Sequence, residues 1–215
     1  MVDRFIKELE HGLVVNGFTV KGEPIKGARY REEYNMRVNV CKGERQDQVC
    51  CAKIFTGRLP YYRPWIELFD IYGCLHMGGK DVEYFDSKLE QGILRFFADM
   101  LEPGENFFVE YYRDQETRRQ LQSGVPAPAT RLGALLYERG FTWFKDWYYP
   151  EGFLEGEPKL QGEKPLNTEE KNRQNTRLLR ELDVFIDRRN NHHPAVLLQR
   201  AYDRAEEIIS KYRAY

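Results

Sequence analysis

The chain has 215 residues, 33 basic and 34 acidic side chains and a formal net charge of -1. Hydrophobic residues make up 41% and aromatic residues 14% of it, enough to build a core and too much for general disorder. The balanced charge denies the chain the positive field of non-specific nucleic-acid binders, so a nucleic-acid partner is not expected. No apolar run approaches the roughly 18 residues of a membrane span, and the charged first ten residues are not signal-like. We therefore expect a cytoplasmic location and no membrane partner.

The first part of the chain predicts a short helix followed by strands. Apolar residues recur at helical spacing over Val2–Glu10, and Leu13–Val20 is rich in Val and Phe, as in a strand. Tyr34–Cys41 alternates apolar and polar side chains, which is typical of a half-buried strand. Val49–Phe55 is a second such run, so the two predict an antiparallel hairpin.

The four cysteines do not have the spacing of a zinc site, and no metal is expected. Cys41 and Cys50 flank a turn-like segment and could face each other across the predicted hairpin. Reduced, partly buried thiols are the ordinary state in the cytosol, whereas a disulfide there would be unusual.

The middle of the chain predicts a crossover between two strands. Trp65–Tyr72 is a continuously apolar run interrupted by Glu67 and Asp70, as in an interior strand, and a glycine-containing loop follows it. Phe85–Leu101 has the apolar spacing of a helix, and Phe107–Tyr112 reads as the next strand. A strand joined through a helix to another strand of one sheet favours a parallel pair. With the antiparallel hairpin, the expected class is α+β with a mixed, mainly antiparallel sheet flanked by helices.

The segment from Pro126 to Tyr149 has the clearest local signals. Thr130 is a suitable N-cap, Gly140 accepts the positive φ of a helix stop, and a helix is predicted over about residues 131–139. Its leucines recur at three- and four-residue spacing and form one apolar stripe. The aromatic run after Gly140 predicts a strand.

The last part of the chain predicts a helical extension. Gly152–Pro165 has the composition of a surface loop or hairpin excursion. A helix is predicted from Thr168 to about Arg189, and Pro194 opens a last one. We expect a domain over residues 1–166 and a helical hairpin over residues 167–215, packed on that domain or on the partner subunit of a homodimer.

The sequence Leu136-Tyr137-Glu138-Arg139-Gly140-Phe141, together with this order of elements, resembles the GNAT superfamily of acyl-CoA-dependent N-acyltransferases. In that superfamily a helix ending in LYxxxGF precedes a late strand; here the spacing is one residue shorter. The longer phrase from Thr130 to Phe153 is similar to an uncharacterised archaeal and bacterial family associated with the same superfamily. The resemblance implies a GNAT-like fold, acetyl-CoA or another acyl-CoA as cofactor, and a small amine as acceptor.

The resemblance also implies a cradle for the pyrophosphate of the cofactor. In the superfamily this is a Q/R-x-x-G-x-G/A loop between a central strand and a helix, whose backbone N–H groups meet the phosphates. The matching place here has Gly78, Gly79 and Lys80 without the full signature, and an ordinary glycine turn is the alternative. Arg131 is a further candidate for contact with phosphate, with a solvated charged face as its alternative.

Two residues are candidates for the proton transfers. Tyr137 stands where many members of the superfamily carry the tyrosine that protonates the leaving thiolate, and Glu67 lies on the strand that often supplies the base. Glu67 is preferred to Asp70, which points to the other face, because Trp65 and Phe69 give it an apolar setting. The structural alternatives are a buried ion pair for Glu67 and simple packing for Tyr137.

Two functional hypotheses follow. The first is a small enzyme that transfers an acyl group to an amine. The second is a non-catalytic, homo-oligomeric binding or assembly module of the same fold, with a degenerate cofactor cleft.

Overall fold

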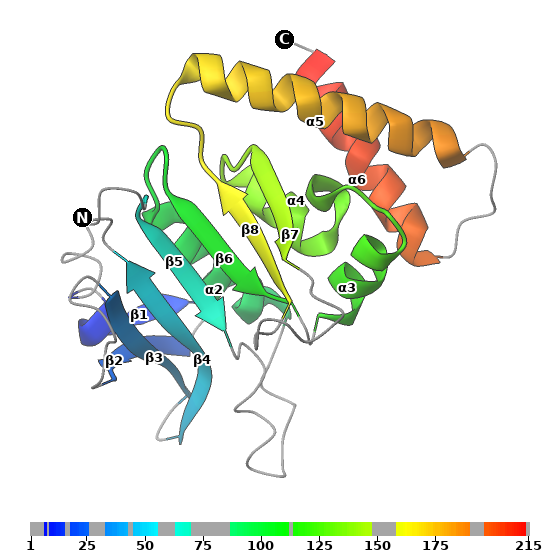
Figure 1. Cartoon of the computed structure of the whole chain (residues 1–215). Helices are drawn as coiled ribbons and strands as arrows, with labels where there is room; N and C mark the ends of the chain where they lie inside the picture. Colours follow the sequence, from blue (N-terminus) through cyan, green and yellow to red (C-terminus); the bar gives the residue numbers. More distant parts are fainter. Residues whose placement is uncertain are drawn as a thin grey trace. The chain divides into compact units, whose positions relative to one another are not determined.

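The computed structural model describes residues 7, 9–15, 18–25, 33–42, 45–55, 63–69, 87–111, 114–147, 158–189 and 196–213 (Figure 1). The chain forms two compact units, residues 1–110 and 111–215. Each unit has its own internal packing. The predicted boundary between residues 166 and 167 stays a prediction.

The first unit is built on a sheet in which sequential strands are neighbours (Figure 1). Its strands are β1 (Leu13–Val15), β2 (Phe18–Pro24), β3 (Glu33–Lys42), β4 (Arg45–Phe55), β5 (Trp65–Phe69) and β6 (Asn106–Glu110). The pairs from β1 to β5 are antiparallel, and only β5 and β6 run parallel among the described pairs. The predicted α+β class with a mixed, mainly antiparallel sheet is therefore confirmed.

The parallel pair is connected by helix α2 (Ser87–Met100). Within the described residues, α2 agrees closely with the helix predicted over residues 85–101. Residues 85 and 86 lie outside the described part. Its buried side chains are spaced three and four residues apart, so one face of α2 enters the core of the unit. Over residues 91–100, where the side chains of α2 are described, they are Ile93, Leu94, Phe97 and Ala98.

The start of the chain differs from the prediction. The single strand expected over Leu13–Val20 is two strands, β1 and β2, which pair with Val15 opposite Phe18. The sequence Asn16-Gly17 between them is the strongest short hairpin signal, because both residue types accept positive φ. Of the helix expected over Val2–Glu10, Lys7, Leu9 and Glu10 are described and helical, and residues 2–6 and 8 lie outside the described part.

The register of β3 and β4 bears on the disulfide hypothesis. Cys41 is the Cα partner of Gln46, and Cys50 is the partner of Val38. The two cysteines are thus displaced along the hairpin by about three residues, or roughly 10 Å, whereas bridged Cα atoms lie within about 7 Å. This register does not allow a bridge between them.

The second unit begins with short helices and a strand hairpin. Helix α3 (Gln115–Gln122), the 3-10 turn η3 (Ala127–Ala129) and helix α4 (Arg131–Glu138) come first. Strands β7 (Trp143–Trp147) and β8 (Lys159–Glu163) follow and pair antiparallel. Thr130 caps α4, and Gly140 has φ +89°, as predicted. β8 falls within the segment for which a loop or a hairpin excursion was predicted.

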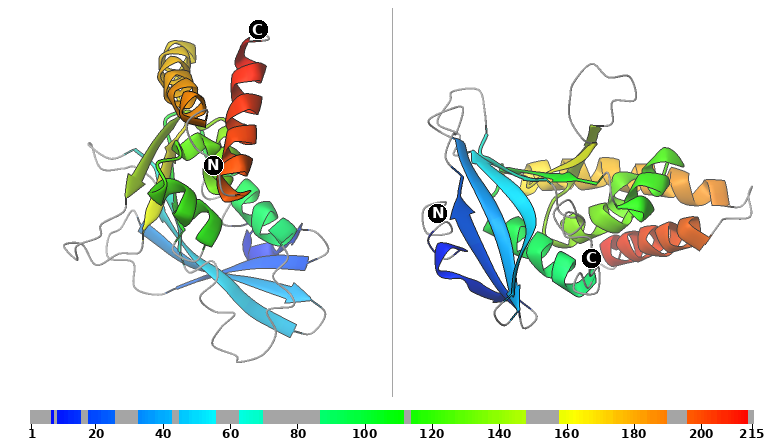
Figure 2. Two further views of the ribbon diagram at one scale, coloured as in Figure 1. Left: turned by 90° about the vertical axis from the view of Figure 1, so that its right-hand side faces the viewer. Right: turned by 90° about the horizontal axis from the view of Figure 1, so that it is seen from below.

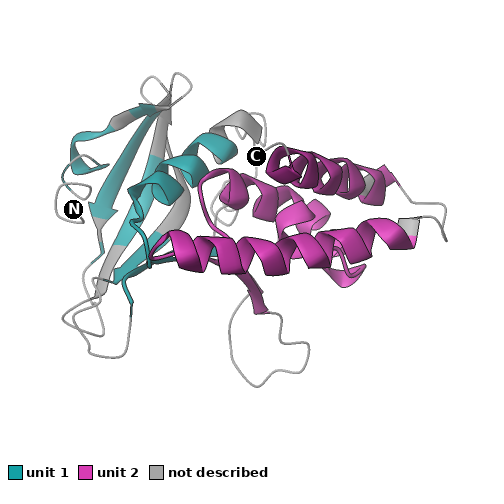
Figure 3. Ribbon diagram, turned by 90° about the horizontal axis from the view of Figure 1, so that it is seen from above, with its two compact units in different colours: residues 1–110 teal, residues 111–215 magenta. Residues whose placement is uncertain are grey.

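The chain ends in two long helices, α5 (Thr168–Arg189) and α6 (Val196–Arg213), which lie side by side (Figure 2). Their apolar faces form one cluster, in which Phe185 and Tyr202 stack at 4.4 Å between ring centroids. The same cluster takes in Val125 and Ala129 from the region of η3. The helical hairpin therefore shares one core with the rest of its own unit (Figure 3).

Hydropathy along these helices bears on membrane insertion. Among the described residues, no helix combines the length and the apolar character that crossing a membrane requires.

Candidate functional site

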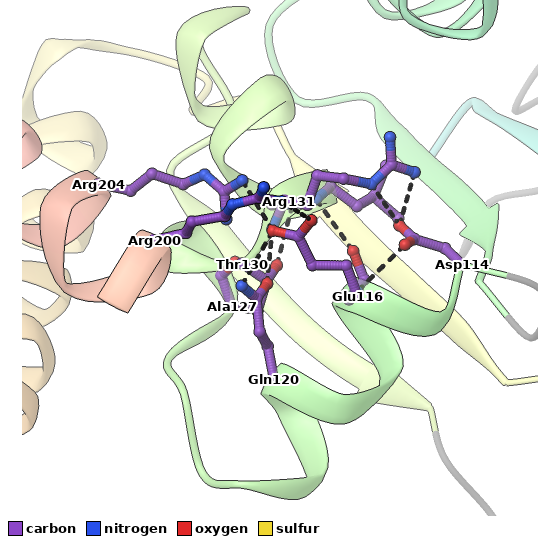
Figure 4. Close-up of polar contacts among 11 residues, drawn as sticks. Asp114, Glu116, Gln120, Ala127, Thr130, Arg131, Arg200 and Arg204 are labelled. Carbon is purple, nitrogen blue, oxygen red and sulfur yellow. Dashed lines mark hydrogen bonds and ion pairs between the residues drawn. The ribbon is translucent and has the colours of Figure 1, made fainter. Parts of the chain in front are cut away.

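The first turn of α4 is held by two side chains of α3 and by the N-cap of α4 itself (Figure 4). Gln120 accepts from the backbone N–H of Arg131 at 2.9 Å, and Thr117 accepts from that of Leu132 at 3.1 Å. Thr130, the N-cap, accepts from Gly133 at 3.1 Å. The first three free donors of the helix are thus satisfied within the protein, so this helix start offers no N–H of that set to a phosphate.

Asp114 connects α3 to the same turn. Its carboxylate caps α3 by accepting from the Thr117 N–H at 3.1 Å, and it also receives Arg131 Nη2 at 2.7 Å and Nε at 3.0 Å. Only 7% of the Asp114 side chain and 21% of the Arg131 side chain are exposed. Arg131 is engaged with this carboxylate, so contact with a cofactor phosphate would have to compete with a charge-assisted pair. Its assignment to the cofactor stays a prediction.

Glu116 connects α3 to α6. Its carboxylate accepts from Arg204 Nη2 at 3.0 Å, Arg200 Nη1 at 3.1 Å and Gln120 Nε2 at 3.2 Å (Figure 4). Arg204 also has a second terminal nitrogen, Nη1, that is buried without a hydrogen-bond partner. The buried polar groups around α3 therefore form one continuous network, from Asp114 through the start of α4 to α6.

Glu67 lies on β5 in the first unit and is half-buried. It shares its face with Trp65, whose ring stacks on Phe55 at 5.6 Å and meets Phe108 edge-on at 5.9 Å, so the apolar setting predicted for it includes these rings. In the register of the sheet, Glu67 stands beside Phe108 of β6 and Lys53 of β4. A lysine at that position suits the ion-pair alternative as well as a catalytic carboxylate.

Tyr137 lies on α4 in the second unit and packs against the cluster formed by α5 and α6. Burial raises the pKa of its phenol, the nearby Tyr212 raises it further, and Lys211 lowers it. The raised pKa keeps the phenol protonated, as a proton donor must be, but the ring is also a packing element. Both predicted roles for Tyr137 are therefore consistent with its surroundings.

The remaining predicted residues are not part of the described chain. Gly78, Gly79 and Lys80, assigned to the phosphate cradle, lie outside it, as does Asp70, the alternative to Glu67. The described part of the chain thus brings Arg131 and Tyr137 into one unit and places Glu67 in the other.

A pair that the sequence did not point to is Tyr111 with Asp146. The Tyr111 hydroxyl donates to Asp146 Oδ1 at 2.5 Å, across 35 positions of the chain. Burial raises the pKa of the Asp146 carboxyl, and the hydrogen bond from Tyr111 lowers it. No spacing rule relates the two residues, so only the fold reveals them.

Comparison with known proteins adds a family and a structural relative. The model of a family described as "Protein of unknown function (DUF1122)" matches residues 16–189. The chain is similar to the crystal structure of a protein of unknown function, AQ1966 from Aquifex aeolicus VF5, at 32% identity and a TM-score of 0.77. That similarity covers 97% of this chain and 99% of the other. No curated protein matches the chain.

Proposed function

This chain belongs to the DUF1122 family, whose description states no function, and we propose that it is an acyl-CoA-dependent N-acyltransferase of GNAT-like fold. The observation that supports the proposal is the parallel pair β5–β6, joined through α2 within an otherwise antiparallel run of strands. In the superfamily that the sequence resembles, the cofactor's phosphates meet a glycine loop between a central strand and a helix. Here the same place in the chain, between β5 and α2, holds Gly78 and Gly79.

The order of elements after the parallel pair also supports this function. Helix α4, capped by Thr130, ends at Glu138; Gly140, at positive φ, and then the β7–β8 hairpin follow it. The superfamily places its LYxxxGF helix before a late strand in the same way. The donor would be acetyl-CoA or another acyl-CoA, and the acceptor a small amine.

Glu67 and Tyr137 are the base and acid that the resemblance implies. In acyl transfer the base takes a proton from the amine, the nitrogen attacks the thioester carbon, and the acid protonates the departing thiolate. Glu67 has the half-buried, aromatic surroundings that suit a base. Tyr137 carries its proton at neutral pH, as the acid must; burial raises the pKa of its phenol, which keeps it protonated but makes it a weaker donor.

Cofactor binding is tested by thermal unfolding with acetyl-CoA titrated to the millimolar range. Ligand at about 100 times its dissociation constant adds roughly 2.7 kcal/mol to the free energy of unfolding, a readily measured rise in Tm. Gly79→Asp, which places a carboxylate in the predicted cradle, is expected to abolish the rise. Absence of any rise in the wild-type protein at millimolar acetyl-CoA contradicts the proposal.

Catalysis is tested by release of free thiol in the presence of spermidine or a lysine-containing peptide. Glu67→Gln is expected to lower turnover by about 100-fold or more, as loss of a general base does. Glu102→Gln, an exposed carboxylate in the same unit, is the matched control and is expected to leave turnover unchanged.

A second candidate is a non-catalytic binding or assembly module of the same fold, and the position of Tyr137 favours it. With one residue fewer before the glycine, Tyr137 is rotated by about 100° around the helix relative to the superfamily's tyrosine. By distance from Gly140, Leu136 occupies the superfamily's position, and Leu136 is fully buried. Measuring mass by light scattering together with the acetyl-CoA titration separates the two: a stable homodimer without acetyl-CoA binding identifies the module.

A further inference from the structure

The sheet of the first unit has two different faces along β5 and β6. One face is buried in the core that α2 enters, and its side chains are Ile66, Leu68, Phe107 and Val109. Figure 1 shows α2 on one side of these strands. Because side chains alternate along a strand, Trp65 and Glu67 point to the other face, where both are half-buried. This second face therefore carries a carboxylate outside the core of the unit.

Aromatic rings make the second face apolar around Glu67. Trp65 stacks on Phe55 of β4 with 5.6 Å between ring centroids and 15° between ring planes, and it meets Phe108 of β6 edge-on at 5.9 Å. In the register of the sheet, Phe108 is the direct neighbour of Glu67. Trp65 precedes Glu67 by two residues on the same strand, which separates their Cα atoms by about 7 Å. The carboxylate thus has one ring beside it on β6 and another before it on β5.

The neighbour of Glu67 on the other side, on β4, is a cation. Lys53 is the Cα partner of Glu67 and is also half-buried. A positively charged ligand that approaches from the side of β4 is repelled by the Lys53 ammonium. The rings of Trp65 and Phe108 carry no charge, and aromatic faces attract cations. An ammonium therefore reaches the Glu67 carboxylate from the side of the rings, and the rest of its molecule lies against them.

We propose that the acceptor of the acyl group is an arylalkylamine, in which a primary ammonium is joined to an aromatic ring by a short carbon chain. This inference rests on the proposed function and adds the class of acceptor to the site that contains Glu67. The ring of the acceptor packs on Trp65 and Phe108, and its ammonium lies at the carboxylate. A polyamine has no ring to bury there, so it is the poorer acceptor.

The transfer with such an acceptor needs no further reactant. Glu67 takes one proton of the ammonium, and the freed nitrogen forms a bond to the thioester carbon. The carbon–sulfur bond breaks, the departing thiolate takes the second proton of the nitrogen, and the third stays on the amide product. Glu67 then returns its proton to water.

Acceptor binding is tested by isothermal titration calorimetry with phenethylamine and with butylamine, in the absence and in the presence of free coenzyme A. This measurement needs no activity. We expect phenethylamine to bind about tenfold more tightly than butylamine, because its ring removes more apolar surface from water. Equal affinity for the two amines, or binding of neither under both conditions, overturns the inference.

Variants of the second face locate the binding. Phe108→Leu keeps an apolar side chain and removes the ring, so it is expected to lower the preference for phenethylamine by about threefold or more. Phe96→Leu, which removes a half-buried ring on α2 of the same unit, is the matched control and should keep the preference. Glu67→Gln should weaken the binding of both amines, because both lose the carboxylate. A preference that survives in Phe108→Leu overturns the inference.

Acceptor use is tested by thiol release from acetyl-CoA with phenethylamine and with spermidine. We expect kcat/KM to be about tenfold higher for phenethylamine, mainly through a lower KM, since the ring contributes binding. A higher kcat/KM for spermidine overturns the inference and leaves the proposed function standing. If the wild-type protein releases no thiol with any amine, the proposed function fails, while the calorimetry still decides whether the face beside Glu67 selects an arylalkylamine.

Discussion

Arg131 donates two hydrogen bonds from its guanidinium to one carboxylate oxygen of Asp114, Oδ2: one from Nη2 at 2.7 Å and one from Nε at 3.0 Å. They lie 17 positions apart, on the first residue of α4 and the cap of α3. The same carboxylate also caps α3 through the Thr117 N–H. One side chain thus fixes the start of two helices relative to each other, within a single unit.

Removing the Asp114 carboxylate is expected to destabilise the protein strongly. Asp114→Ala takes away the cap of α3 and leaves the largely buried Arg131 guanidinium without this partner, a combined loss of about 2–4 kcal/mol. Urea unfolding followed by circular dichroism measures it as a lower midpoint. Asp114→Asn is the matched variant, since its amide oxygen can still cap α3 and only the charge is lost. Equal stability of wild type and Asp114→Ala would contradict this account of the pair.

Glycine at position 133 is required by the close approach of η3 to α4. A Cβ at Gly133 would lie 1.7 Å from the backbone oxygen of Ala127, which cannot move without displacing the turn. Gly133→Ala should therefore reduce the free energy of unfolding by about 3 kcal/mol or more, at the upper end of overpacking effects. Thermal unfolding measures the change.

Gly140 is a suitable comparison for Gly133, because glycine is needed at position 140 only for its backbone conformation. It has φ +89°, and no atom lies within 4 Å of a Cβ built there. Gly140→Ala should cost only about 1–2 kcal/mol, the penalty of a left-handed conformation for an L residue. If Gly140→Ala were as damaging as Gly133→Ala, the steric explanation for position 133 would be wrong.

Helix α4 and its two ends were predicted correctly because the signals for them are close together in the sequence. The cap at Thr130, the helix after it and the stop at Gly140 depend on residues within a few positions of one another, so their chemistry is readable directly. Helix α3 was not predicted because QETRRQLQ has no apolar stripe. Its inward face instead uses Thr117 and Gln120, both fully buried, whose acceptors serve the N–H groups of α4. A helix whose buried face consists of polar side chains that accept hydrogen bonds from another helix has no hydrophobic periodicity to detect.

Among the strands too, sequence-based prediction succeeded only where the pattern lies within one strand. The β3–β4 hairpin was predicted because each strand alternates along its own length. In β8 the buried residues Leu160, Gln161 and Gly162 are consecutive and mostly not hydrophobic, so the strand has neither alternation nor an apolar run. Gly162 is needed there because a Cβ would lie 2.9 Å from the Phe141 ring, a contact that only the fold creates. The pairing of Tyr111 with Asp146 was invisible for the same reason.

Glu116 should contribute more to stability than either arginine that it binds. Its largely buried carboxylate joins α3 to Arg200 and Arg204 of α6, and Glu116→Gln removes the charge that both arginines share. We expect a loss of about 1–3 kcal/mol for Glu116→Gln. Arg200→Ala should cost at most about 1 kcal/mol, because 59% of that side chain is exposed and solvent screens the pair. Guanidinium chloride would mask these charges, so urea at low salt is the suitable denaturant. A larger effect from Arg200→Ala than from Glu116→Gln would refute this order.

Ionisation of Tyr137 should make the free energy of unfolding depend on pH in the alkaline range. Its pKa in the folded protein is raised above the ordinary value of about 10 by burial and by Tyr212, partly opposed by Lys211. Below about pH 10 the phenol is neutral in both the folded and the unfolded chain, so its full contribution is present. Above that pH the unfolded chain loses the proton first, and the free energy of unfolding falls as the pH rises toward the folded pKa. Thermal unfolding between pH 8 and 11 should therefore show a smaller fall in Tm for Tyr137→Phe than for wild type, whereas Tyr212→Phe, at an exposed neighbouring position, should keep most of the fall. Parallel curves for wild type and Tyr137→Phe would show that this phenol ionises as readily in the folded protein as in the unfolded chain.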